Sequence, residues 1–375
     1  MIGRRLARHR LLTPAPAQNL AQVAGEICGV HAQMAPSAEL MLGLRVAGID
    51  RKDIREALAE NRTLVKTVGL RGTLHLFPAV EVPTWMAANR LRFEAEERRL
   101  AQRGVDSGRL SAIVNAIGDI VGAEPISRPD FERELEARVG GWAVSTNEGW
   151  AGNMLNWPMA LGWAAALGQV CYGPSPSGRI SFVRLADWTA WREEDPWEAG
   201  QWVLGRFLRA YGPSTPAEFA RWLAVEAAVA KRLFDAASNE LAEVDVEGTR
   251  RWMCAADAEL AAEAAPDAVH LLPHFDVFVV GSHPRYQLMP PGSRVAAVAQ
   301  GTAAGFSVLL VGGRVAGVWE RRPKGSRRLL VRVDPHEPLT RRQRDAVAVQ
   351  AERIAQVLER ECELEYGEVA LRRHL

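Results

Sequence analysis

The chain has 375 residues, of which 48% are hydrophobic and 24% charged, an ordinary balance for a folded protein with room for two or three domains. Its formal net charge of +1 excludes a globally basic nucleic-acid binder but leaves room for a local basic surface. The four cysteines, Cys28, Cys171, Cys254 and Cys362, lie far apart and follow no metal-ligand spacing, which argues against a disulfide framework and favours a reducing compartment.

The N-terminus, "MIGRRLARHRLL", is basic but lacks the apolar core of a signal peptide. No apolar run approaches the length of a membrane span. We therefore expect a cytoplasmic protein with no membrane partner. The run "RRLARHR" carries four arginines and no acid, which is typical either of a solvated face or of a phosphate-contacting patch.

The first segment predicts helices at about 17–28, 37–47 and 51–60, followed by two short strands within "TLVKTVGLRGTLHLFP" (63–78). Three helices followed by a two-stranded ribbon are typical of a winged helix.

The stretch "GVHAQMAPS" (29–37) separates the first two of these helices. Gly29 is a plausible helix terminator and Pro36 disfavours helical backbone just before it, so the pattern favours an extended segment. In such a segment His31 and Gln33 lie on the same side. The alternative is that His31 continues the apolar face of the preceding helix as a buried histidine.

The helix-plus-ribbon pattern recurs twice. "PISRPDFERELEARVG" (125–140) and "GPSTPAEFARWLAVEA" (212–227) share a Ser or Thr cap, an early proline, an acid in the first turn and a leading Phe. Each is followed by a second helical stretch and two strand-like runs, at 168–173 and 178–185, and at 241–248 and 249–255. We therefore predict three tandem winged-helix units over 1–90, 91–195 and 196–285. Eight of the twelve tryptophans fall between Trp142 and Trp202, which favours an aromatic core over a base-stacking platform.

The last segment, 286–375, predicts a small β-barrel or sandwich with a final helix at about 339–362. Its evidence is the β-branched runs "RVAAVA" (294–299), "FSVLLVGGRVAGVWERR" (306–322) and "RRLLVRVDP" (327–335). Within them "WERRPKGSRRLLV" predicts a hairpin with basic residues at its tip, namely Arg321, Arg322, Lys324, Arg327 and Arg328. These residues form either a solvated face or a projection that enters a DNA groove.

Arg71, Thr73 and His75 alternate along the predicted ribbon of the first unit, where they could meet phosphate. An equal alternative is that Arg71 and His75 tie the wing to its own domain.

Metal binding is not expected at the group of His270, His274, His283 and Asp276. The first two lie in a strand-like run, where a four-residue spacing does not bring ligands together. We expect no metal and no cofactor.

Four stretches occur in the order and spacing of one family, namely "RGTLHLFP" (71–78), "YGPSTPAEFARW" (211–222), "LLPHFDVFVVGSHPR" (271–285) and "VLLVGGRVAGVWERR" (308–322). The chain thereby resembles, over nearly its whole length, the bacterial winged-helix DNA glycosylases of the AlkZ/YcaQ type. The resemblance implies a helix-rich α+β fold in which three tandem winged helices form a C-shaped DNA-binding channel beside a C-terminal β-barrel. It also implies excision of alkylated purines.

In that family the catalytic motif is Gln-hydrophobic-Gln, or Gln-hydrophobic-Asp, at the position where this chain has His31-Ala32-Gln33. An alkylated purine is already cationic and leaves as a neutral base, so the enzyme needs no general acid. It must position a water, which the Gln33 amide oxygen could hold and a neutral His31 could orient or deprotonate. Because a free imidazole has a pKa of about 6.5, we expect activity to fall at mildly acidic pH.

The sequence thus predicts a monomeric, monofunctional DNA glycosylase without lyase activity. It would act on double-stranded DNA containing alkylated purines, bulky N7-alkylguanine above all, in base excision repair or in self-resistance to DNA-alkylating natural products. The alternative is a non-enzymatic tandem winged-helix DNA-binding protein, either a transcriptional regulator or a damage-recognition factor, because fold alone does not decide function. RNA binding has no support, since no aromatic RNA-recognition motif is present.

Overall fold

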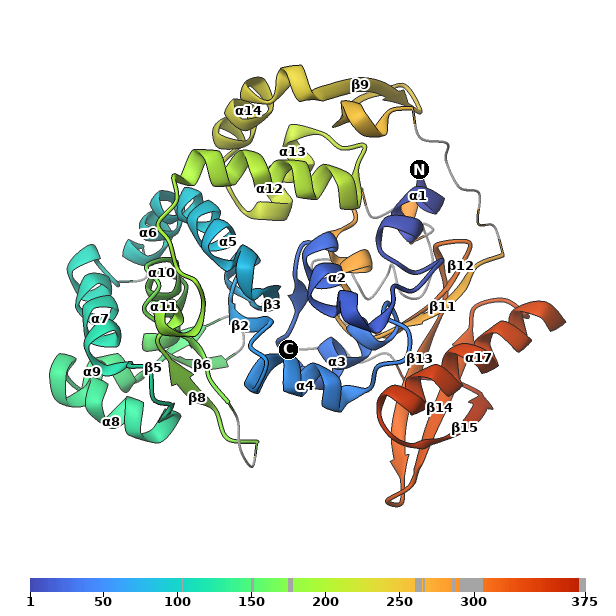
Figure 1. The fold of residues 1–375 in the computed structure, drawn as a ribbon, viewed down its shortest axis with the longest axis horizontal. Helices are drawn as coiled ribbons and strands as arrows, with labels where there is room; N and C mark the ends of the chain where they lie inside the picture. Colours follow the sequence, from blue (N-terminus) through green and yellow to red (C-terminus); the bar gives the residue numbers. More distant parts are fainter. Residues whose placement is uncertain are drawn as a thin grey trace. The chain divides into compact units, whose positions relative to one another are not determined.

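A computed structural model describes residues 1–102, 104–149, 152–174, 178–259, 265, 267–284, 287–289 and 306–370, without the side chains of 147–149 and 152–154 (Figure 1). The strand predicted at 294–299, most of the turn predicted at 174–177, and Arg285 lie outside these residues. The described chain divides into two compact units. Unit 1 comprises 1–55, 206–218 and 240–375, and unit 2 comprises 56–205 and 219–239. The four-domain division remains a prediction.

Unit 1 holds the N-terminal helices and the C-terminal sheet. Its elements are α1 (Ile2–Arg8), η1 (Ala17–Asn19), α2 (Leu20–Glu26), β1 (Val30–His31), α3 (Ala35–Gly43), most of α4 (Arg51–Ala59), the end of α12 (Pro196–Tyr211), the start of α13 (Pro216–Leu223), β9 (Leu241–Val246), β10 (Thr249–Cys254), η8 (Ala255–Asp257), β11 (Val269–Leu272), α15 (Val277–Gly281), β12 (Val308–Val311), β13 (Arg314–Lys324), β14 (Arg328–Pro335), α17 (Arg341–Val357) and β15 (Glu361–Tyr366).

Helix α2 ends where the sequence predicted a stop. The Gly29 amide donates to the Ala24 carbonyl at 2.8 Å, and the Cys28 amide donates to the Gly25 carbonyl at 3.0 Å. These paired bonds are the Schellman pattern of a helix C-terminus. Cys28 (φ 63°) takes the left-handed position and Gly29 (φ 86°) follows it. The chain therefore leaves the helix and enters β1 as extended backbone.

The C-terminal strands form one five-stranded sheet in the order β11-β12-β13-β14-β15. The predicted hairpin is confirmed, with β13 and β14 paired antiparallel from Gly317–Pro335 to Lys324–Arg328. The sheet is a curled half-barrel in which β11 and β15 are the edge strands of the described part, rather than a closed barrel.

The final helix is shorter than predicted. Helix α17 ends at Val357, and β15 pairs parallel with β14. Glu359 has a φ of 57°, which breaks the helix. The segment after it, "ECELEY", alternates acids with larger side chains, the two-residue period of a strand.

The two faces of this sheet are covered by different helices. Leu309, Trp319 and Val331 pack on one face against Val347 and Ile354 of α17. In Figure 1 this helix runs beside β14 and β15. The neighbouring positions Val308 and Leu310 point to the other face, where they pack with Leu6 of α1 and Phe278 of α15. This alternation is the strand period that the β-branched runs predicted.

Helix α3 is held on α17. The Arg353 guanidinium donates to the carbonyls of Gly43, Val46 and Ile49 at 3.0, 2.9 and 3.0 Å. A Cβ on Gly43 would lie 2.5 Å from a methyl group of Val357, so the contact requires glycine. The helix that follows His31-Ala32-Gln33 is therefore anchored on the C-terminal helix.

Unit 2 is mostly helical with a small sheet. Its elements are β2 (Leu64–Val68), η2 (Leu70–Gly72), β3 (Leu74–Pro78), η3 (Ala79–Glu81), α5 (Val82–Asn89), η4 (Arg90–Arg92), α6 (Phe93–Ala101), α7 (Ser107–Ile120), β4 (Ile126–Ser127), α8 (Arg128–Val139), α9 (Gly141–Val144), β5 (Thr146–Gly149), β6 (Gly152–Leu155), η5 (Trp157–Ala160), α10 (Leu161–Ala166), β7 (Cys171–Tyr172), β8 (Ser181–Val183), α11 (Leu185–Trp188), most of α12 and α13, α14 (Ala227–Ala236) and most of η7 (Ser238–Glu240). Within unit 2 the sheet order is β3-β2-β7-β8-β4, and β5 pairs with β6.

Aromatic side chains fill the interior of unit 2. Phe131, Trp157 and Phe182 pack with ring centroids 5.1 to 5.7 Å apart. Phe77 stacks on Trp85 at 5.0 Å. Of the tryptophans between 142 and 202 whose side chains are described, Trp157 and Trp188 are buried and the others are half-buried, which favours the aromatic-core interpretation.

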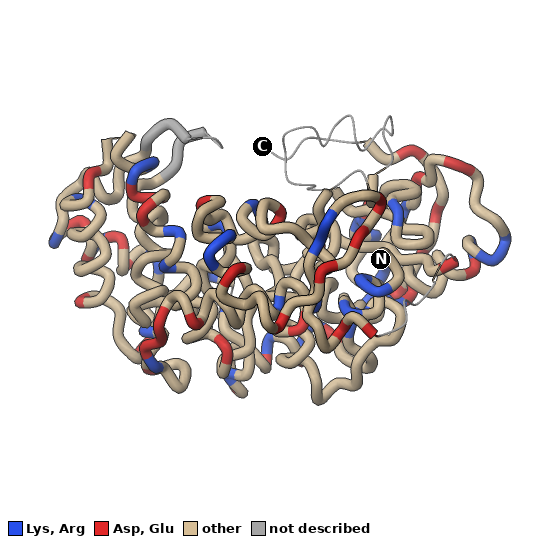
Figure 2. Tube along the Cα trace, turned by 90° about the horizontal axis from the view of Figure 1, so that it is seen from above, with Lys and Arg blue, Asp and Glu red and all other residues tan. Residues whose placement is uncertain are grey.

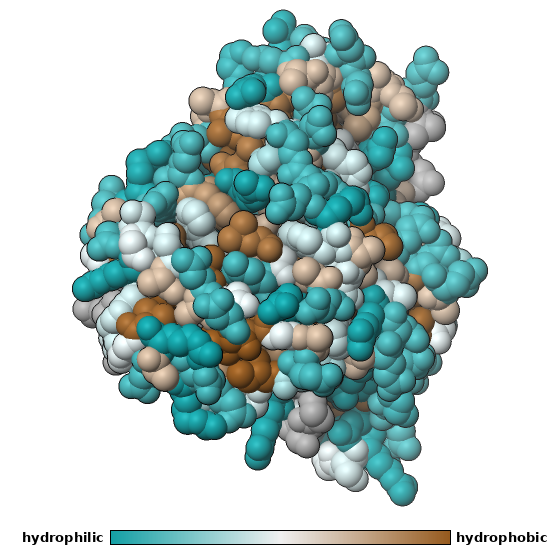
Figure 3. All heavy atoms as spheres, turned by 60° about the vertical axis from the view of Figure 1, so that its left-hand side comes forward, coloured by the Kyte–Doolittle hydropathy of each residue, from teal (hydrophilic) through white to brown (hydrophobic). Residues whose placement is uncertain are grey.

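Acidic and basic residues are interspersed along the described chain (Figure 2). On the face drawn in Figure 3, hydrophilic residues dominate and hydrophobic ones gather in separate patches. Within the described residues, no helix combines the length and apolar character that crossing a membrane requires.

Candidate active site

The His31-Ala32-Gln33 segment leaves strand β1 and enters α3 through a bend. His31 is 6% exposed, and its ring stacks on Phe275 with centroids 5.0 Å apart and planes tilted by 30°. Gln33 is exposed, and Ala32 between them is buried. His31 therefore lies in a strand, not on the face of α2, and combines a fixed imidazole with a solvent-accessible carboxamide two residues later.

Phe275 belongs to the loop that joins β11 to α15, within the stretch "LLPHFDVF". It has a φ of 58°, which is strained for an aromatic residue, so the surrounding structure must hold it. The next residue, Asp276, provides the support, because its carboxylate caps α15 by accepting the Phe278 amide at 3.0 Å. The loop beneath His31 is thus defined by Asp276.

Asp276 is also half of a buried ion pair. The Arg45 guanidinium, just beyond α3, donates two hydrogen bonds to its carboxylate at 2.9 and 2.7 Å and a third to the Met41 carbonyl at 3.0 Å. Both side chains of the pair are 0% exposed. The pair therefore fastens the end of α3 to the loop that carries Phe275, with bidentate geometry.

Two buried histidines are influenced by Arg45. Burial, together with the positive charge of Arg45, lowers the pKa of His270 to about 4. Burial, with Arg45 and Arg5, lowers the pKa of His9 well below its usual range. Both imidazoles are therefore neutral at pH 7.

Glu39 lies in α3, the helix that follows the His31-Ala32-Gln33 segment, and it forms ion pairs with two arginines. Its buried carboxylate lies 3.3 Å from Arg51 and 2.8 Å from Arg55. The electrostatic influence of Glu39 extends to Arg321, whose pKa is lowered mainly by burial. Arg321 is half-buried in unit 1, whereas the four other basic residues predicted at the hairpin tip are exposed.

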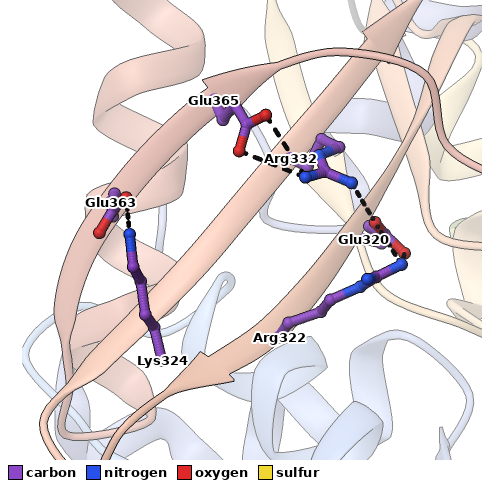
Figure 4. Close-up of polar contacts among 6 residues, drawn as sticks. All are labelled: Glu320, Arg322, Lys324, Arg332, Glu363 and Glu365. Carbon is purple, nitrogen blue, oxygen red and sulfur yellow. Dashed lines mark hydrogen bonds and ion pairs between the residues drawn. The ribbon is translucent and has the colours of Figure 1, made fainter.

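Three of these four exposed residues face acidic neighbours on the same sheet, and Figure 4 draws two of them, Arg322 and Lys324. Lys324 binds Glu363 at 2.5 Å, and Arg322 binds Glu320 at 3.0 Å. Arg328 lies 3.6 Å from Glu361. Figure 4 also shows Arg332 between Glu320 and Glu365, at 3.3 Å from each. The run 321–333 contains no acid, so its sequence gave no sign that β15 would place carboxylates beside it.

The N-terminal basic run is likewise paired. Arg4 and Arg8 lie 3.3 and 2.6 Å from Asp257, and Arg10 makes a bidentate pair with Glu26 at 2.7 and 2.8 Å. This favours a structural role for much of the run.

The predicted phosphate contacts of the first ribbon lie in unit 2. Arg71 (φ 56°) donates to the Trp222 carbonyl at 2.8 Å, and the Thr73 hydroxyl donates to the Leu70 carbonyl at 2.9 Å. His75 is 0% exposed, with Nδ1 3.0 Å from the Thr73 carbonyl oxygen and its ring stacked on Phe77. The contacts of His75 are the ones expected if it ties the wing to its own domain, whereas Arg71 ties the wing to Trp222, which lies in the third predicted unit; contact with DNA stays a prediction.

No group of three potential metal ligands occurs among the described residues. Asp276 is committed to Arg45, and His274 Nδ1 lies 2.7 Å from the Ser307 hydroxyl. Sequence reasoning considered Asp276 only as a metal ligand and missed its pairing with Arg45. Its position in "LLPHFDVF", directly before an apolar helix, is the signal of a helix cap.

Comparison with known proteins decides the family. The model of the DNA glycosylase AlkZ-like family matches residues 24–357. The chain belongs to the AlkZ-like DNA glycosylase family. A curated member of similar sequence is the "Interstrand DNA cross-link repair glycosylase" of Streptomyces sahachiroi, 30% identical over 326 residues that cover 84% of this chain and 85% of that one.

A solved structure supports the same assignment. The chain matches the Streptomyces sahachiroi DNA glycosylase AlkZ with a TM-score of 0.80 and 25% identity, over 98% of each chain. The helix-rich α+β fold that the resemblance implied is thereby confirmed. The range matched by the family model, 24–357, includes the His31 motif and the loop of Phe275 and Asp276.

Proposed function

We propose that this AlkZ-like chain is a monofunctional DNA glycosylase that hydrolyses the N-glycosidic bond of alkylated, cationic purines in double-stranded DNA. The observation that carries the proposal is the combination of a fixed, nearly buried His31 with an exposed Gln33, at the position where the resemblance predicts the catalytic motif. Bulky N7-alkylguanine is the proposed substrate class, because the adduct leaves the base cationic and its departure needs no protonation. The activity would serve base excision repair or resistance to DNA-alkylating natural products.

In the proposed reaction, a water attacks C1′ while the glycosidic electron pair leaves with the base. The Gln33 amide oxygen accepts one hydrogen of that water and fixes its position. A neutral His31 accepts the proton that the water loses as its oxygen bonds to C1′. Because the His31 ring stacks on Phe275, its imidazole is already oriented before the reaction begins. No amine attacks the sugar, and therefore no strand-cleaving lyase step is expected.

The finer architecture belongs to the same proposal. Three winged-helix units would form a C-shaped channel around DNA beside the C-terminal sheet, in a monomer. The exposed cations Arg322, Lys324, Arg327 and Arg328 would approach phosphates, with Arg71 and Thr73 contributing from the first ribbon. Arg321 and His75 would support these surfaces from within, because the first is half-buried and the second fully buried.

Single-turnover excision tests the proposal. A duplex carrying N7-methylguanine, and a second carrying a guanine–guanine N7 cross-link, are incubated with protein and then cleaved at abasic sites with alkali. We expect Gln33→Ala to slow excision by about 10²- to 10⁴-fold and His31→Ala to slow it less. Gln18→Ala, which truncates an exposed glutamine outside the motif, serves as the matched control and should leave the rate unchanged.

Four outcomes would contradict parts of the proposal. Excision that survives Gln33→Ala would remove the proposed water-binding role, and a larger effect of His31→Ala would reverse the two assignments. DNA binding without excision by the wild-type protein would instead favour the non-enzymatic DNA-binding alternative. A rate that stays flat from about pH 5.5 to 8 would contradict His31 as the base.

A further inference from the structure

Three arginines of unit 1 surround a single buried carboxylate, that of Glu39 in α3. The Glu39 side chain is 7% exposed, and its two oxygens are divided between Arg51, at 3.3 Å, and Arg55, at 2.8 Å. These two arginines are four residues apart in α4, so they lie on the same face of that helix. Both carboxylate oxygens of Glu39 are therefore taken by α4.

The third arginine, Arg321, belongs to β13. Trp319, two residues earlier in the same strand, packs on the sheet face that α3 and α17 cover. Side chains alternate along a strand, so Arg321 lies on this covered face as well. Burial lowers its pKa, and the two charges that act on it are those of Glu39 and Arg51. Arg321 thus adds its charge to the cluster from the side of the sheet.

The cluster has more N–H donors and more positive charge than Glu39 can use. Arg321 is half-buried, yet it forms no side-chain hydrogen bond or ion pair with a described residue, and its guanidinium nitrogens are accessible to solvent. Arg55 donates through Nε to Glu39, and its side chain is 57% exposed. Three cations around one carboxylate repel one another, and an anion bound among them would relieve that repulsion.

The neighbouring acids do not neutralise this excess charge. Asp50 accepts the Lys52 amide at 2.6 Å, and Asp53 accepts the Asp50 amide at 2.8 Å, so both carboxylates satisfy backbone groups at the start of α4. Glu320 precedes Arg321 in β13 and therefore points to the other face of the sheet, where it lies 3.3 Å from Arg332.

The chemistry of the cluster suits a phosphate group. Guanidinium groups bind phosphate through paired N–H donors. The chain belongs to a family of DNA glycosylases, and each DNA strand carries one phosphate per nucleotide. The cluster also lies close to the motif, because Glu39 is only about 6 Å along the axis of α3 from its first residue, Ala35, which follows Gln33 by two positions.

We propose that Arg51, Arg55 and Arg321 together bind one phosphate group of the DNA backbone next to the nucleotide that Gln33 faces. Glu39 orients the two guanidinium groups of α4, and Arg321 supplies the third charge. The place of this phosphate beside the target nucleotide rests on the proposed function, whereas phosphate binding by the cluster does not. The three arginines hold the strand while C1′ reacts, so they are positioning residues.

The first test measures DNA affinity without excision. Fluorescence anisotropy follows the binding of an undamaged duplex between about 50 and 200 mM salt. We expect the double variant Arg55→Gln with Arg321→Gln to weaken binding at least tenfold and to reduce the slope of log K against log salt by about 0.9, the value of one shared phosphate. This variant leaves Arg51 on the buried Glu39. Arg55→Lys, which keeps the charge, should keep the slope.

A matched control removes two charges elsewhere in unit 1. Arg341 and Arg342 are both exposed at the start of α17, and Arg342 lies 3.3 Å from Asp267. The double variant Arg341→Gln with Arg342→Gln should leave the slope unchanged. Urea midpoints of both double variants should equal that of the wild type, which separates loss of a DNA contact from loss of structure.

The second test locates the phosphate. A duplex carries 2′-fluoro-N7-methylguanine, whose glycosidic bond resists hydrolysis, and single neutral methylphosphonates replace the phosphates within three nucleotides of it, one at a time. One replacement should weaken binding to the wild type about tenfold and should have no effect on the Arg55→Gln with Arg321→Gln variant, because that contact is already lost. Inorganic phosphate, titrated with phosphorus NMR, tests a free anion as the occupant.

The outcomes separate this proposal from the proposed function. An unchanged salt slope in the Arg55→Gln with Arg321→Gln variant, no sensitive phosphate within three nucleotides, or a sensitive phosphate that stays sensitive in the variant would overturn the site. So would inorganic phosphate binding that the variant loses while its DNA affinity stays normal. None of these results bears on excision by the wild type. A wild-type protein that shows the expected slopes but excises nothing would instead remove the proposed glycosylase function and leave phosphate binding by the cluster standing.

Discussion

The buried pair of Arg45 and Asp276 makes the strongest prediction about stability. Replacing Asp276 by Asn keeps a side chain that can still cap α15 but removes the negative charge. Arg45 would then remain 0% exposed, facing a neutral amide in place of the carboxylate that now accepts its two hydrogen bonds. The substitution therefore measures the loss of unfolding free energy that results when the buried Arg45 has no counter-ion.

The expected magnitude follows from that burial. Removing one partner of a fully buried ion pair costs about 3–5 kcal/mol of unfolding free energy. Asp276→Ala should cost about 1 kcal/mol more, because the cap to the Phe278 amide is lost as well. The double variant Arg45→Met with Asp276→Asn should lose no more than Asp276→Asn alone, since no uncompensated charge remains.

Urea unfolding of the wild type, the three variants and Arg45→Met alone, with hydrogen exchange of the amides in β11 and α15, measures these differences and the coupling between the two sites. Excision should fall in Asp276→Asn as well, because the loop holding Phe275 beneath His31 loosens. A loss below about 1 kcal/mol for Asp276→Asn, or a double variant that costs the sum of the two single ones, would refute the reasoning about the pair.

Four further results are expected. Gly43→Ala should destabilise the protein by about 1–3 kcal/mol, because its Cβ would lie 2.5 Å from Val357; denaturant titration measures the loss, and no loss would contradict the close approach of α3 to α17. Gly205→Ala, in α12 where a Cβ meets nothing within 4 Å, is its matched control and should stabilise by about 0.5–1 kcal/mol. His270 should contribute about 2 kcal/mol to the unfolding free energy that is lost between pH 7.5 and 5.0. The reason is that the unfolded state takes up a proton below pH 6.5, whereas His270 in the folded state has a pKa of about 4 and takes up its proton only at lower pH. The His270→Gln variant should lose less stability over this range, and an unchanged loss would contradict the lowered pKa. Glu363→Gln should free Lys324 for phosphate and steepen the salt dependence of DNA affinity, whereas an unchanged slope would place the hairpin away from DNA.

Much of the local structure could be predicted from the sequence because it depends on neighbouring residues. The end of α2 before Gly29, the extended entry to His31 and the β13–β14 hairpin all follow from turn chemistry and side-chain period. The strand β15 was missed because "ECELEY" follows a strong helical pattern, and its partner strand ends 26 residues earlier, at Pro335.

The surroundings of the motif could not be predicted in the same way. Arg45 meets Asp276 across 231 residues of sequence, and no local pattern announces such a pairing. The same holds for the stacking of His31 on Phe275 and for the carboxylates that β15 places beside Lys324. The net charge follows from the composition. Which lysines and arginines form ion pairs within the protein can be learned only from the three-dimensional structure.

Unit 1 is built from three separate stretches of chain, and this has a consequence for synthesis in the cell. When Arg45 leaves the ribosome, its counter-ion Asp276 is still 231 residues away, which at about 5–20 residues per second means roughly 10–50 seconds of waiting. During that interval the N-terminal segment exposes Leu6 and Leu40, whose partners on the C-terminal sheet have not been made. We therefore expect nascent chains to engage chaperones at this segment, and messages truncated before the final sheet to yield no active protein.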